Sequence, residues 1–461
     1  MTEALYSIPA CVRRFITGAG FPFPAEEMQP YIEEWRSLLA SDGEFWDYRS
    51  NENGISRKVH RRTIHPAARV ANEWASLLMN DKTTVSTDDA ACNDWLRSYM
   101  ARTGFMARGQ ALVKKAFALG TAAWALWLDT SSMSIQVRRY DARMVVPLSW
   151  DDDGVSECAF CSRASYGGER CDQVQMHLLG ADGYHIVTAV FDGDGKQVQP
   201  EGVLPDFATG CPTPTFALVK PAIENTRVDM SPYGESVYAD AADAMKAVDL
   251  CYDALMNEVD LSKLRVFMSD MLIEYAEGRD GVRTPIPFGR DDAAVFRKVS
   301  SDSDLIQAYA PAMRTASQVE AYRIALQTMG DLCGFGLRYF DIDDSGGVKT
   351  ATEVSADNSA LMRNIRKHEN ALGDSISQIA HAMLFCAREH LGESLPDEGE
   401  VSVSWDDSII TDTAADKAQD MAELNVTMNP WEYRMKWYGE DEETAKANVP
   451  QAQRIDLLPQ A

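Results

Sequence analysis

Four residues in the middle of the chain carry the side chains that zinc prefers. Cys158 and Cys161 form a Cys-x-x-Cys pair, and Cys171 and His177 follow a short distance along the chain. Thiolate and imidazole ligands at short spacing suit a tetrahedral zinc ion. The second half of this set is irregularly spaced, however, and contains no second Cys-x-x-Cys. The spacing therefore favours small apolar cysteines on the strands of a reduced protein over a zinc site.

An acidic segment further along the chain resembles the first half of a calcium-binding loop. Positions one, three, five and six of such a loop are matched by Asp341, Asp343, Ser345 and Gly346. Position twelve requires a bidentate Glu, and Thr352 occupies it here. The sequence therefore favours an acidic loop between two helices over a calcium site.

The remaining candidate residues give no reason to expect catalysis. The chain contains no G-x-x-x-x-G-K-[ST], no H-E-x-x-H and no G-x-S-x-G. His60 and His65 flank a basic segment that could contact phosphate, although a solvated helix face with acids nearby is the better interpretation. Asp406 and Asp407 follow a predicted strand, where adjacent side chains point to opposite faces and cannot act as an acid–base pair. We therefore expect no enzyme, no cofactor and no bound metal.

Composition and charge limit the partners that the chain could bind. Its 461 residues allow two to four domains, and 45% apolar with 25% charged residues is typical of a folded protein. The formal charge of −26 opposes tight binding of nucleic acid or anionic lipid, although it permits loose passage of DNA. Nine scattered cysteines indicate reduced thiols. The apolar run 116–128 is too short to span a bilayer and no secretory signal is visible, so we expect a cytosolic protein without a membrane span.

Apolar spacing predicts an α+β fold that is mainly helical. The first 125 residues have helical periodicity, whereas residues 125–219 consist of short β-branched runs between turns and predict an antiparallel sheet. Further helices are expected over 231–264, 316–334 and 350–391, with a β excursion at 266–309, a strand at 401–405 and a helix near 414–424. Such long rods do not fit one compact globule, so we expect an elongated subunit whose rods pack against identical copies.

Several segments share their order and spacing with a known family. They are Val70-Ala-Asn-Glu-Trp-Ala-Ser-Leu-Leu78, residues 111–124 with Leu119-Gly-Thr-Ala, Ser231-Pro-Tyr-Gly-Glu-Ser236, Asn257-Glu258, Lys349-Thr-Ala-Thr-Glu-Val354 and residues 401–410. No single segment is specific. Together, over residues 5–440, they resemble the portal proteins of tailed bacteriophages.

The resemblance implies an elongated subunit with wing, stem, clip and small crown regions. About twelve such subunits would form a ring around an axial channel at one vertex of the capsid. By position, the regions are the wing (1–230, helical and then β-rich), stem helices (231–265 and 313–335), clip (266–312), channel loop (336–349), long helix (350–392), returning wing strand (393–415) and crown (416–461).

The same resemblance implies a structural role in packaging and ejecting double-stranded DNA and in joining head to tail. A ring of twelve chains carries on the order of −300 formal charges, so the duplex would slide through it without tight binding. The expected channel-loop residues are Arg338, Asp341, Asp343, Asp344, Gly346, Gly347 and Lys349. Either Arg338 and Lys349 contact the passing strand, or they form salt bridges with the loop acids. The expected clip residues, which would face the packaging motor and later the adaptor unless they form a solvated hairpin, are Arg279, Arg283, Pro285, Pro287 and Arg290.

The implied partners are other copies of the chain, double-stranded DNA without sequence specificity, the terminase large subunit, a scaffold, the major capsid protein and a head-completion adaptor. The terminase would supply the ATP hydrolysis that this chain cannot. The protein would be located at the portal vertex of the virion after assembly in the host cytoplasm. Two alternatives stay open at this point. One is a metal-binding enzyme that uses the cysteine cluster or the acidic loop, and the other is a capsid structural protein without a channel.

Overall fold

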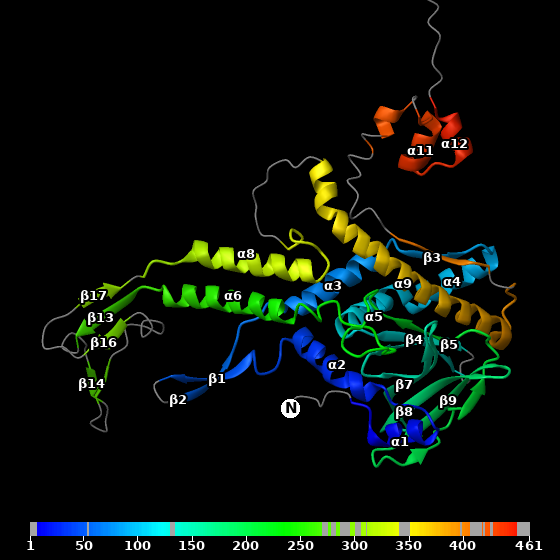
Figure 1. The fold of residues 1–461 in the computed structure, drawn as a ribbon, viewed down its shortest axis with the longest axis horizontal. Helices are drawn as coiled ribbons and strands as arrows, with labels where there is room; N and C mark the ends of the chain where they lie inside the picture. Colours follow the sequence, from blue (N-terminus) through cyan, green and yellow to red (C-terminus); the bar gives the residue numbers. More distant parts are fainter. Residues whose placement is uncertain are drawn as a thin grey trace, which may run out of the picture.

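The computed structural model describes residues 7–52, 55–129, 134–269, 275–277, 283–285, 296–299, 306–309, 311–340, 351–396, 399–405, 417, 420–424 and 427–449. Figure 1 shows an α/β body from which two helices project side by side, with small β elements at their far end. More of the chain is helical than extended, in agreement with the predicted α+β class. No helix in the described part of the chain is long and apolar enough to cross a membrane.

Helices dominate the N-terminal part, and local sequence signals set their ends. Asp89 accepts a hydrogen bond from the backbone N–H of Cys92 and caps one helix, and Gly104, with a φ of 63°, separates that helix from the next. Pro66 stands at the first position of another helix, where its missing N–H costs nothing. The helices are α1 (Ala10–Gly18), α2 (Ala25–Ala40), α3 (Pro66–Leu78), α4 (Ala90–Thr103) and α5 (Phe105–Leu119).

The prediction that the first 125 residues are helical throughout is wrong at two places. Strands β1 (Asp47–Glu52) and β2 (Ile55–His60) form a hairpin, and β3 (Thr84–Thr87) pairs with a strand near the C-terminus. Tyr48 lies opposite Val59 across the hairpin, a cross-strand pair of aromatic and β-branched side chains that stabilises extended structure. The basic segment that we expected on a helix face therefore begins on β2, with Arg57, Lys58 and His60, and continues past the strand end with Arg61 and Arg62.

The predicted antiparallel sheet is confirmed, but it is divided into two. Strand β4 (Ala122–Asp129) lies between β12 (Phe216–Val219) and β5 (Ser134–Asp141) in a three-stranded sheet. A larger antiparallel sheet runs in the order β10-β9-β8-β7-β6, with β11 also paired to β9. Its strands are β6 (Val145–Asp151), β7 (Gly154–Tyr166), β8 (Glu169–Gly180), β9 (Gly183–Phe191), β10 (Gln197–Val198) and β11 (Asp206–Ala208).

The first of the three predicted long helices begins later than expected. Helix α6 spans Ala242–Leu261, so residues 231–241 are not helical. In this segment the backbone N–H of Gly234 binds the Thr121 hydroxyl at 3.0 Å, and the backbones of Gly120 and Gly234 pack so closely that a Cβ on either residue would meet the carbonyl oxygen of the other at 2.4–2.5 Å. These tertiary contacts hold the segment against α5 in a series of bends and turns and override its helical pattern.

The other two long helices and the β excursion lie where the sequence predicts them. Helix α8 spans Thr315–Leu332, and α9 spans Ala351–Leu391, a length of about 60 Å at 1.5 Å per residue. Gly392, with a φ of 68°, follows the end of α9. The excursion contains β13 (Arg265–Ser269), β14 (Tyr275–Glu277), β15 (Arg283–Pro285), β16 (Phe296–Val299) and β17 (Ile306–Tyr309).

The C-terminal part returns to the body and then leaves it. Strand β18 (Val401–Ser404) pairs antiparallel with β3, which confirms the predicted strand. Helices α11 (Pro430–Tyr438) and α12 (Glu442–Ala447) follow. Of the helix expected near 414–424, residues 420–423 are helical, and several of the others lie outside the described residues.

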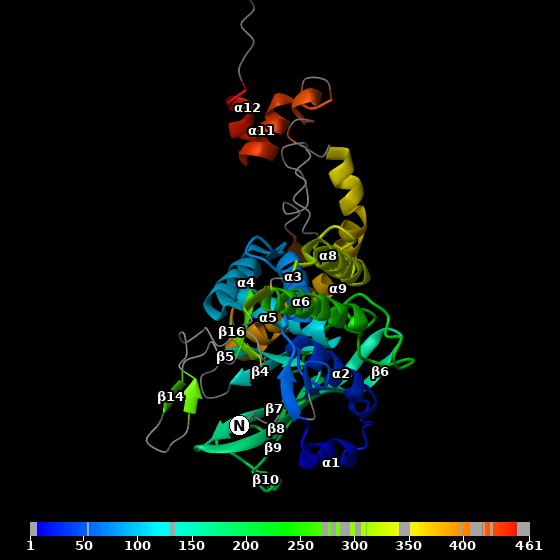
Figure 2. The same cartoon turned by 90° about the vertical axis from the view of Figure 1, so that its left-hand side faces the viewer.

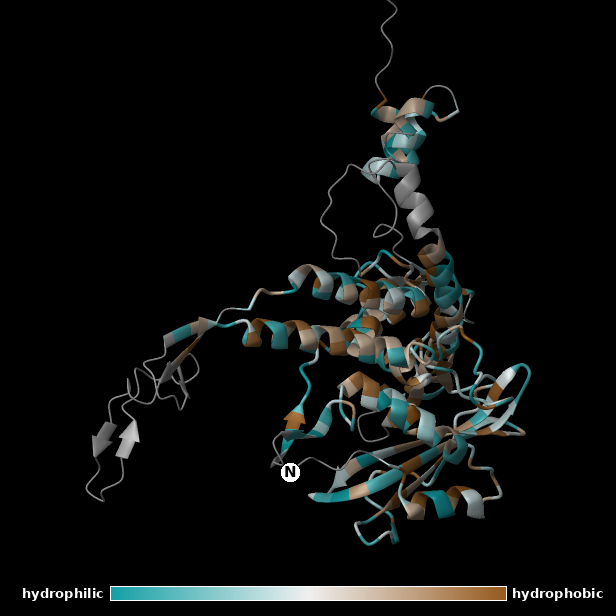
Figure 3. Ribbon diagram, turned by 60° about the vertical axis from the view of Figure 1, so that its left-hand side comes forward, coloured by the Kyte–Doolittle hydropathy of each residue, from teal (hydrophilic) through white to brown (hydrophobic). Residues whose placement is uncertain are grey.

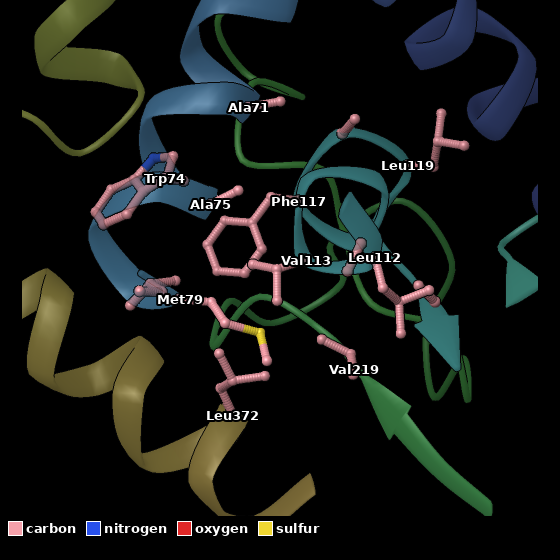
Figure 4. Packing of buried hydrophobic residues seen from close by; sticks show 14 of the residues in the cluster. Ala71, Trp74, Ala75, Met79, Leu112, Val113, Phe117, Leu119, Val219 and Leu372 are labelled. Carbon is pink, nitrogen blue, oxygen red and sulfur yellow. The ribbon is translucent and has the colours of Figure 1, made fainter. Parts of the chain in front are cut away.

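One large hydrophobic core joins α3, α5 and α9. Trp74 and Ala75 on α3 face Val113 and Phe117 on α5, and Leu372 on α9 closes the cluster (Figure 4). All five side chains are buried. Burial of a large apolar side chain contributes about 1.5–3 kcal/mol, so this cluster fixes the long helix against the N-terminal layer.

Candidate functional site: the projecting helix pair and the loop before α9

Helices α6 and α8 form the projecting pair that the sequence suggested would meet other copies. They lie side by side over their length and lead outward to β13 and β17 (Figures 1 and 2). Hydrophobic residues (brown) and hydrophilic residues (teal) alternate along both helices, so neither helix is wholly polar (Figure 3). The large hydrophobic side chains of these two helices that are about half exposed in the single chain are Leu250, Val259, Leu261, Ile324 and Leu332.

An arginine–glutamate pair joins the outer ends of the two helices. The guanidinium of Arg314 donates to both carboxylate oxygens of Glu258, at 2.6 and 3.1 Å, and the Arg314 backbone N–H donates to the same carboxylate at 3.2 Å. These hydrogen bonds lower the pKa of Glu258 and raise that of Arg314. The pair fixes the start of α8 beside the end of α6 through a bidentate contact.

A buried carboxylate attaches the inner part of α6 to the body. Asp249 is fully buried and accepts hydrogen bonds from Trp46 Nε1 at 2.8 Å, the Thr63 hydroxyl at 2.6 Å and the Ile64 backbone N–H at 3.0 Å. A buried charge is tolerated only when hydrogen bonds replace its hydration, as these three donors do. Near the outer end, Arg62 donates to Asp260 at 2.6 Å. Two points therefore hold α6 to the segment between the β1–β2 hairpin and α3.

The segment between α8 and α9 begins with an aromatic anchor that sequence reasoning missed. Phe335 and Phe340 are buried, and Phe335 packs on Trp74 at a ring distance of 4.5 Å. Trp74 Nε1 donates to the carbonyl oxygen of Cys333, and Asn364 Nδ2 donates to the carbonyl oxygen of Gly334. The sequence signal that could have indicated this anchor is the group of three aromatic residues, Phe335, Tyr339 and Phe340, beside Gly334 and Gly336.

The backbone at Gly334 explains why this turn requires glycine. Its φ is 85°, in the left-handed region, and a Cβ would lie 3.1 Å from Asn364 Nδ2. The tight turn redirects the chain from the end of α8 onto α3 and α9. The expected channel loop, 336–349, therefore starts from a fixed point on the body.

Only Arg338 among the expected channel-loop residues is described, and its side chain is exposed between the two anchoring phenylalanines. The other six lie outside the described residues. They are Asp341, Asp343, Asp344, Gly346, Gly347 and Lys349. The structure therefore gives no geometry for the acidic part of this loop.

Two of the five expected clip residues belong to a described strand. Arg283 and Pro285 are the first and last residues of β15, which pairs with β14. Arg279, Pro287 and Arg290 lie outside the described residues. The roles that we assigned to this set stay predictions.

The four candidate zinc ligands are not assembled into one site. Cys158 and Cys161 are buried in different hydrophobic clusters, and Cys171 belongs to a third. His177 Nδ1 lies 2.7 Å from the Thr215 hydroxyl, and burial lowers the pKa of its imidazole to about 3. Burial raises the pKa of Cys158 and Cys161, which opposes thiolate formation. Within the described residues, no group of three or more His, Cys, Asp or Glu side chains could hold a metal ion.

The basic segment on β2 has acids beside it, as the sequence suggested. His60 and Lys58 lie near Asp47 across the hairpin, with Nδ1 to Oδ1 at 3.1 Å for the histidine. Arg61 stacks over the ring of Phe45 at 3.9 Å. These contacts agree with the interpretation of a solvated basic segment with acids nearby.

A comparison with protein-family models decides the family. The model described as "Phage portal protein, SPP1 Gp6-like" matches residues 26–453, which is nearly the whole chain. The chain belongs to this family of portal proteins. Portal proteins are in general structural and non-enzymatic, and the metal-binding enzyme that we kept as an alternative is not supported. A comparison with curated protein sequences gave no match.

Several solved structures are similar to this portal protein at low identity. A chain in "Neck of native GTA particle computed with C12 symmetry" is 13% identical, with 87% of this chain and 93% of that chain covered and a TM-score of 0.38. A chain in "Virion of native gene transfer agent (GTA) particle" is 12% identical, with 80% and 89% covered and a TM-score of 0.37. A third, in "Neck of empty GTA particle computed with C6 symmetry", is 12% identical, with 80% and 88% covered and a TM-score of 0.36.

Proposed function

We propose that about twelve copies of this portal protein form a ring around an axial channel at one capsid vertex. Double-stranded DNA enters through the channel during packaging and leaves through it during ejection, and the ring joins the head to the tail. The observation that carries the proposal is the projecting α6–α8 pair in a chain that belongs to the portal family. Helices of about 30 Å that project from the body with half-exposed leucine, isoleucine and valine side chains need partners, and identical copies supply them.

The regions of the subunit follow from this proposal. The wing is residues 1–230 together with the returning strand at 393–415. The stem consists of the helices within 231–265 and 313–335, and the clip is residues 266–312. The channel loop is residues 336–349, the long helix is 350–392 and the small crown is 416–461. In this assignment α9 braces the channel loop, because Asn364 on α9 holds the Gly334 carbonyl at the start of the segment.

The charge of the ring suits a conduit for a duplex. Twelve chains of formal charge −26 carry on the order of −300 charges, and an acidic bore repels the phosphate backbone. The DNA therefore slides without sequence-specific contacts. In this proposal Arg338 and Lys349, which flank the acidic residues in the sequence, contact the passing strand, and salt bridges to Asp341, Asp343 or Asp344 are the alternative.

The proposed partners follow from the same role. The terminase large subunit and later the head-completion adaptor meet the clip through Arg279, Arg283, Pro285, Pro287 and Arg290. The scaffold and the major capsid protein surround the wing during assembly. The protein assembles in the host cytoplasm and is located at the portal vertex of the virion.

Light scattering of the purified protein tests the proposal. At micromolar concentration and across several salt concentrations, we expect a particle mass of about twelve chains, because the half-exposed apolar residues of the helix pair drive association. A chain that stays monomeric or dimeric under all these conditions would contradict the ring.

A further inference from the structure

A groove lined by arginines lies between the α4–α5 junction and the strands β5 and β7. Its volume is about 490 Å³, and its polar lining includes Arg108, Arg138, Arg139 and Arg163. No Asp or Glu belongs to the described residues that line it. Four guanidinium groups around one groove make a strongly basic patch, although the chain has 70 acidic residues and 44 basic ones.

Among the described residues, an acidic side chain neutralises one of these four arginines. Arg163 Nε donates to Asp172 at 3.2 Å. Arg138 stacks over the ring of Trp127 at 4.1 Å, and Arg139 donates to the carbonyl oxygen of Arg108 at 2.8 Å. Over the described part of the chain, Arg108, Arg138 and Arg139 have no ion pair. Burial and the neighbouring Arg108 lower the pKa of Arg139, which is the direction expected for cations gathered without a counter-charge.

A second groove, of about 570 Å³, has the opposite charge. It lies between the β6–β7 turn and α9, and Asp151, Asp153 and Asp374 are among the residues that line it. These three side chains and the adjacent Asp152 are exposed, and within the described residues none of them forms an ion pair. One basic residue, Lys220, is among the described residues that line this groove, and its ammonium group donates a hydrogen bond to the Pro232 carbonyl oxygen at 3.2 Å.

The two grooves lie at opposite ends of β7. The acidic turn immediately precedes Gly154, the first residue of the strand, and Arg163 lies nine residues further along. At about 3.3 Å per residue, the strand separates them by about 30 Å. Figure 2 shows α4 and β5, which border the arginine groove, on one side of the body and β6, which leads to the acidic turn, on the other.

We propose that the arginine groove of one subunit receives the Asp151–Asp153 turn of the next copy. A closed ring is built from head-to-tail contacts, in which two different patches on opposite sides of the subunit meet. The basic and acidic grooves form such a pair, and each occurs once in every copy. Complementary charge at an interface fixes its register and excludes wrong partners. The inference rests on the proposed ring and assigns one interface within it.

The rival occupant of the groove is a phosphate backbone. The acidic turn is the better candidate because it is present in equal number, lies on the opposite side of the same subunit and forms no ion pair with any described residue. An anionic ring also disfavours phosphate at its surface.

Charge reversal tests the interface. The two single variants are Arg139→Glu and Asp153→Lys, and the combined variant carries both changes. We expect each single variant to raise the protein concentration needed for half-maximal ring assembly by about tenfold or more, and the combined variant to recover most of this loss. Arg108→Glu, which leaves the Arg139 side chain in place, should act like Arg139→Glu. Arg97→Glu on α4 and Asp194→Lys in another exposed turn are matched controls that should assemble normally.

The outcomes separate this inference from the proposed function. If the wild-type protein forms no ring, the proposed function fails and the interface fails with it. If rings form and every charge-reversal variant assembles like the wild type, only the interface is overturned. If assembly is unchanged while Arg139→Glu weakens binding of a short duplex DNA, the groove is a phosphate site and the interface is again overturned.

Discussion

At the scale of single residues, a few buried polar groups connect the projecting helices to the body. Asp249 is the strongest example, because three donors from residues 46–64 converge on one buried carboxylate. The sequence could not predict this contact, since the donors lie about 190–200 positions away from the acceptor. The burial of Cys158, Cys161 and Cys171 was predictable, because their spacing favoured small apolar cysteines on strands, which is where the structure places them.

Replacing Asp249 with Ala should loosen α6 from the body. The change leaves the Trp46 indole N–H, the Thr63 hydroxyl and the Ile64 N–H without their acceptor, at about 1–3 kcal/mol for each buried orphan group. We expect chemical denaturation to show a loss of several kcal/mol, with a smaller loss for Asp249→Asn, which keeps one acceptor oxygen. Asp243→Ala on the same helix removes a fully exposed carboxylate and is the control. Equal stability of Asp249→Ala and the control would refute this role.

His368 should make the protein less stable in mild acid. Its Nδ1 accepts the Ala222 N–H at 3.0 Å, and burial, with Lys367 nearby, lowers its pKa to about 4. Below about pH 6.5 the unfolded chain binds a proton at this residue that the folded chain does not, so stability falls between pH 6.5 and 4. The loss from this residue is up to about 3 kcal/mol.

The variant His368→Asn keeps an acceptor near the Nδ1 position and removes the titration. Urea unfolding at pH 7.5 and pH 5 should show a smaller pH dependence for this variant than for the wild type. An identical pH dependence for His368→Asn and the wild type would contradict the explanation.

At the scale of elements, the spacing of apolar residues predicted the bounds of two of the long helices well. The bounds of α8 and α9 lie within two residues of the predicted ones, and Gly392 ends α9 as expected. The predicted start of α6 was wrong because Gly120, Thr121 and Phe117 hold residues 234–237 in a non-helical conformation, and a local sequence pattern does not indicate such distant contacts. The β1–β2 hairpin was missed for a related reason, since cross-strand pairing depends on residues about ten positions apart.

Gly234→Ala should disrupt the close packing that precedes α6. The new Cβ would lie 2.4 Å from the Gly120 carbonyl oxygen and 3.0 Å from the Lys220 Cβ, so the two backbones must move apart. Overpacking of this kind costs about 1–3 kcal/mol, which thermal unfolding would detect. Gly193→Ala, where a Cβ meets no atom within 4 Å, is the matched control. If Gly234→Ala unfolds at the wild-type temperature, the close approach does not determine where α6 begins.

At the scale of the whole molecule, two kinds of surface on the described part of the chain are suited to contacts with other copies. The α6–α8 pair carries half-exposed large apolar side chains, and the two ends of β7 carry opposite charges. The order of the sequence segments predicted the family, which the family model confirms. It could not predict the arginine groove, because Arg108, Arg139 and Arg163 come from separate elements that only the folded sheet brings together.

Electron micrographs of the purified wild-type protein test the central claim most directly. We predict end-on averages that show a closed ring of about twelve subunits with an open axial hole, because the projecting helices find their missing partners in identical neighbours. Averages that show a separate globule for each chain, or an assembly without a central hole, would contradict the account.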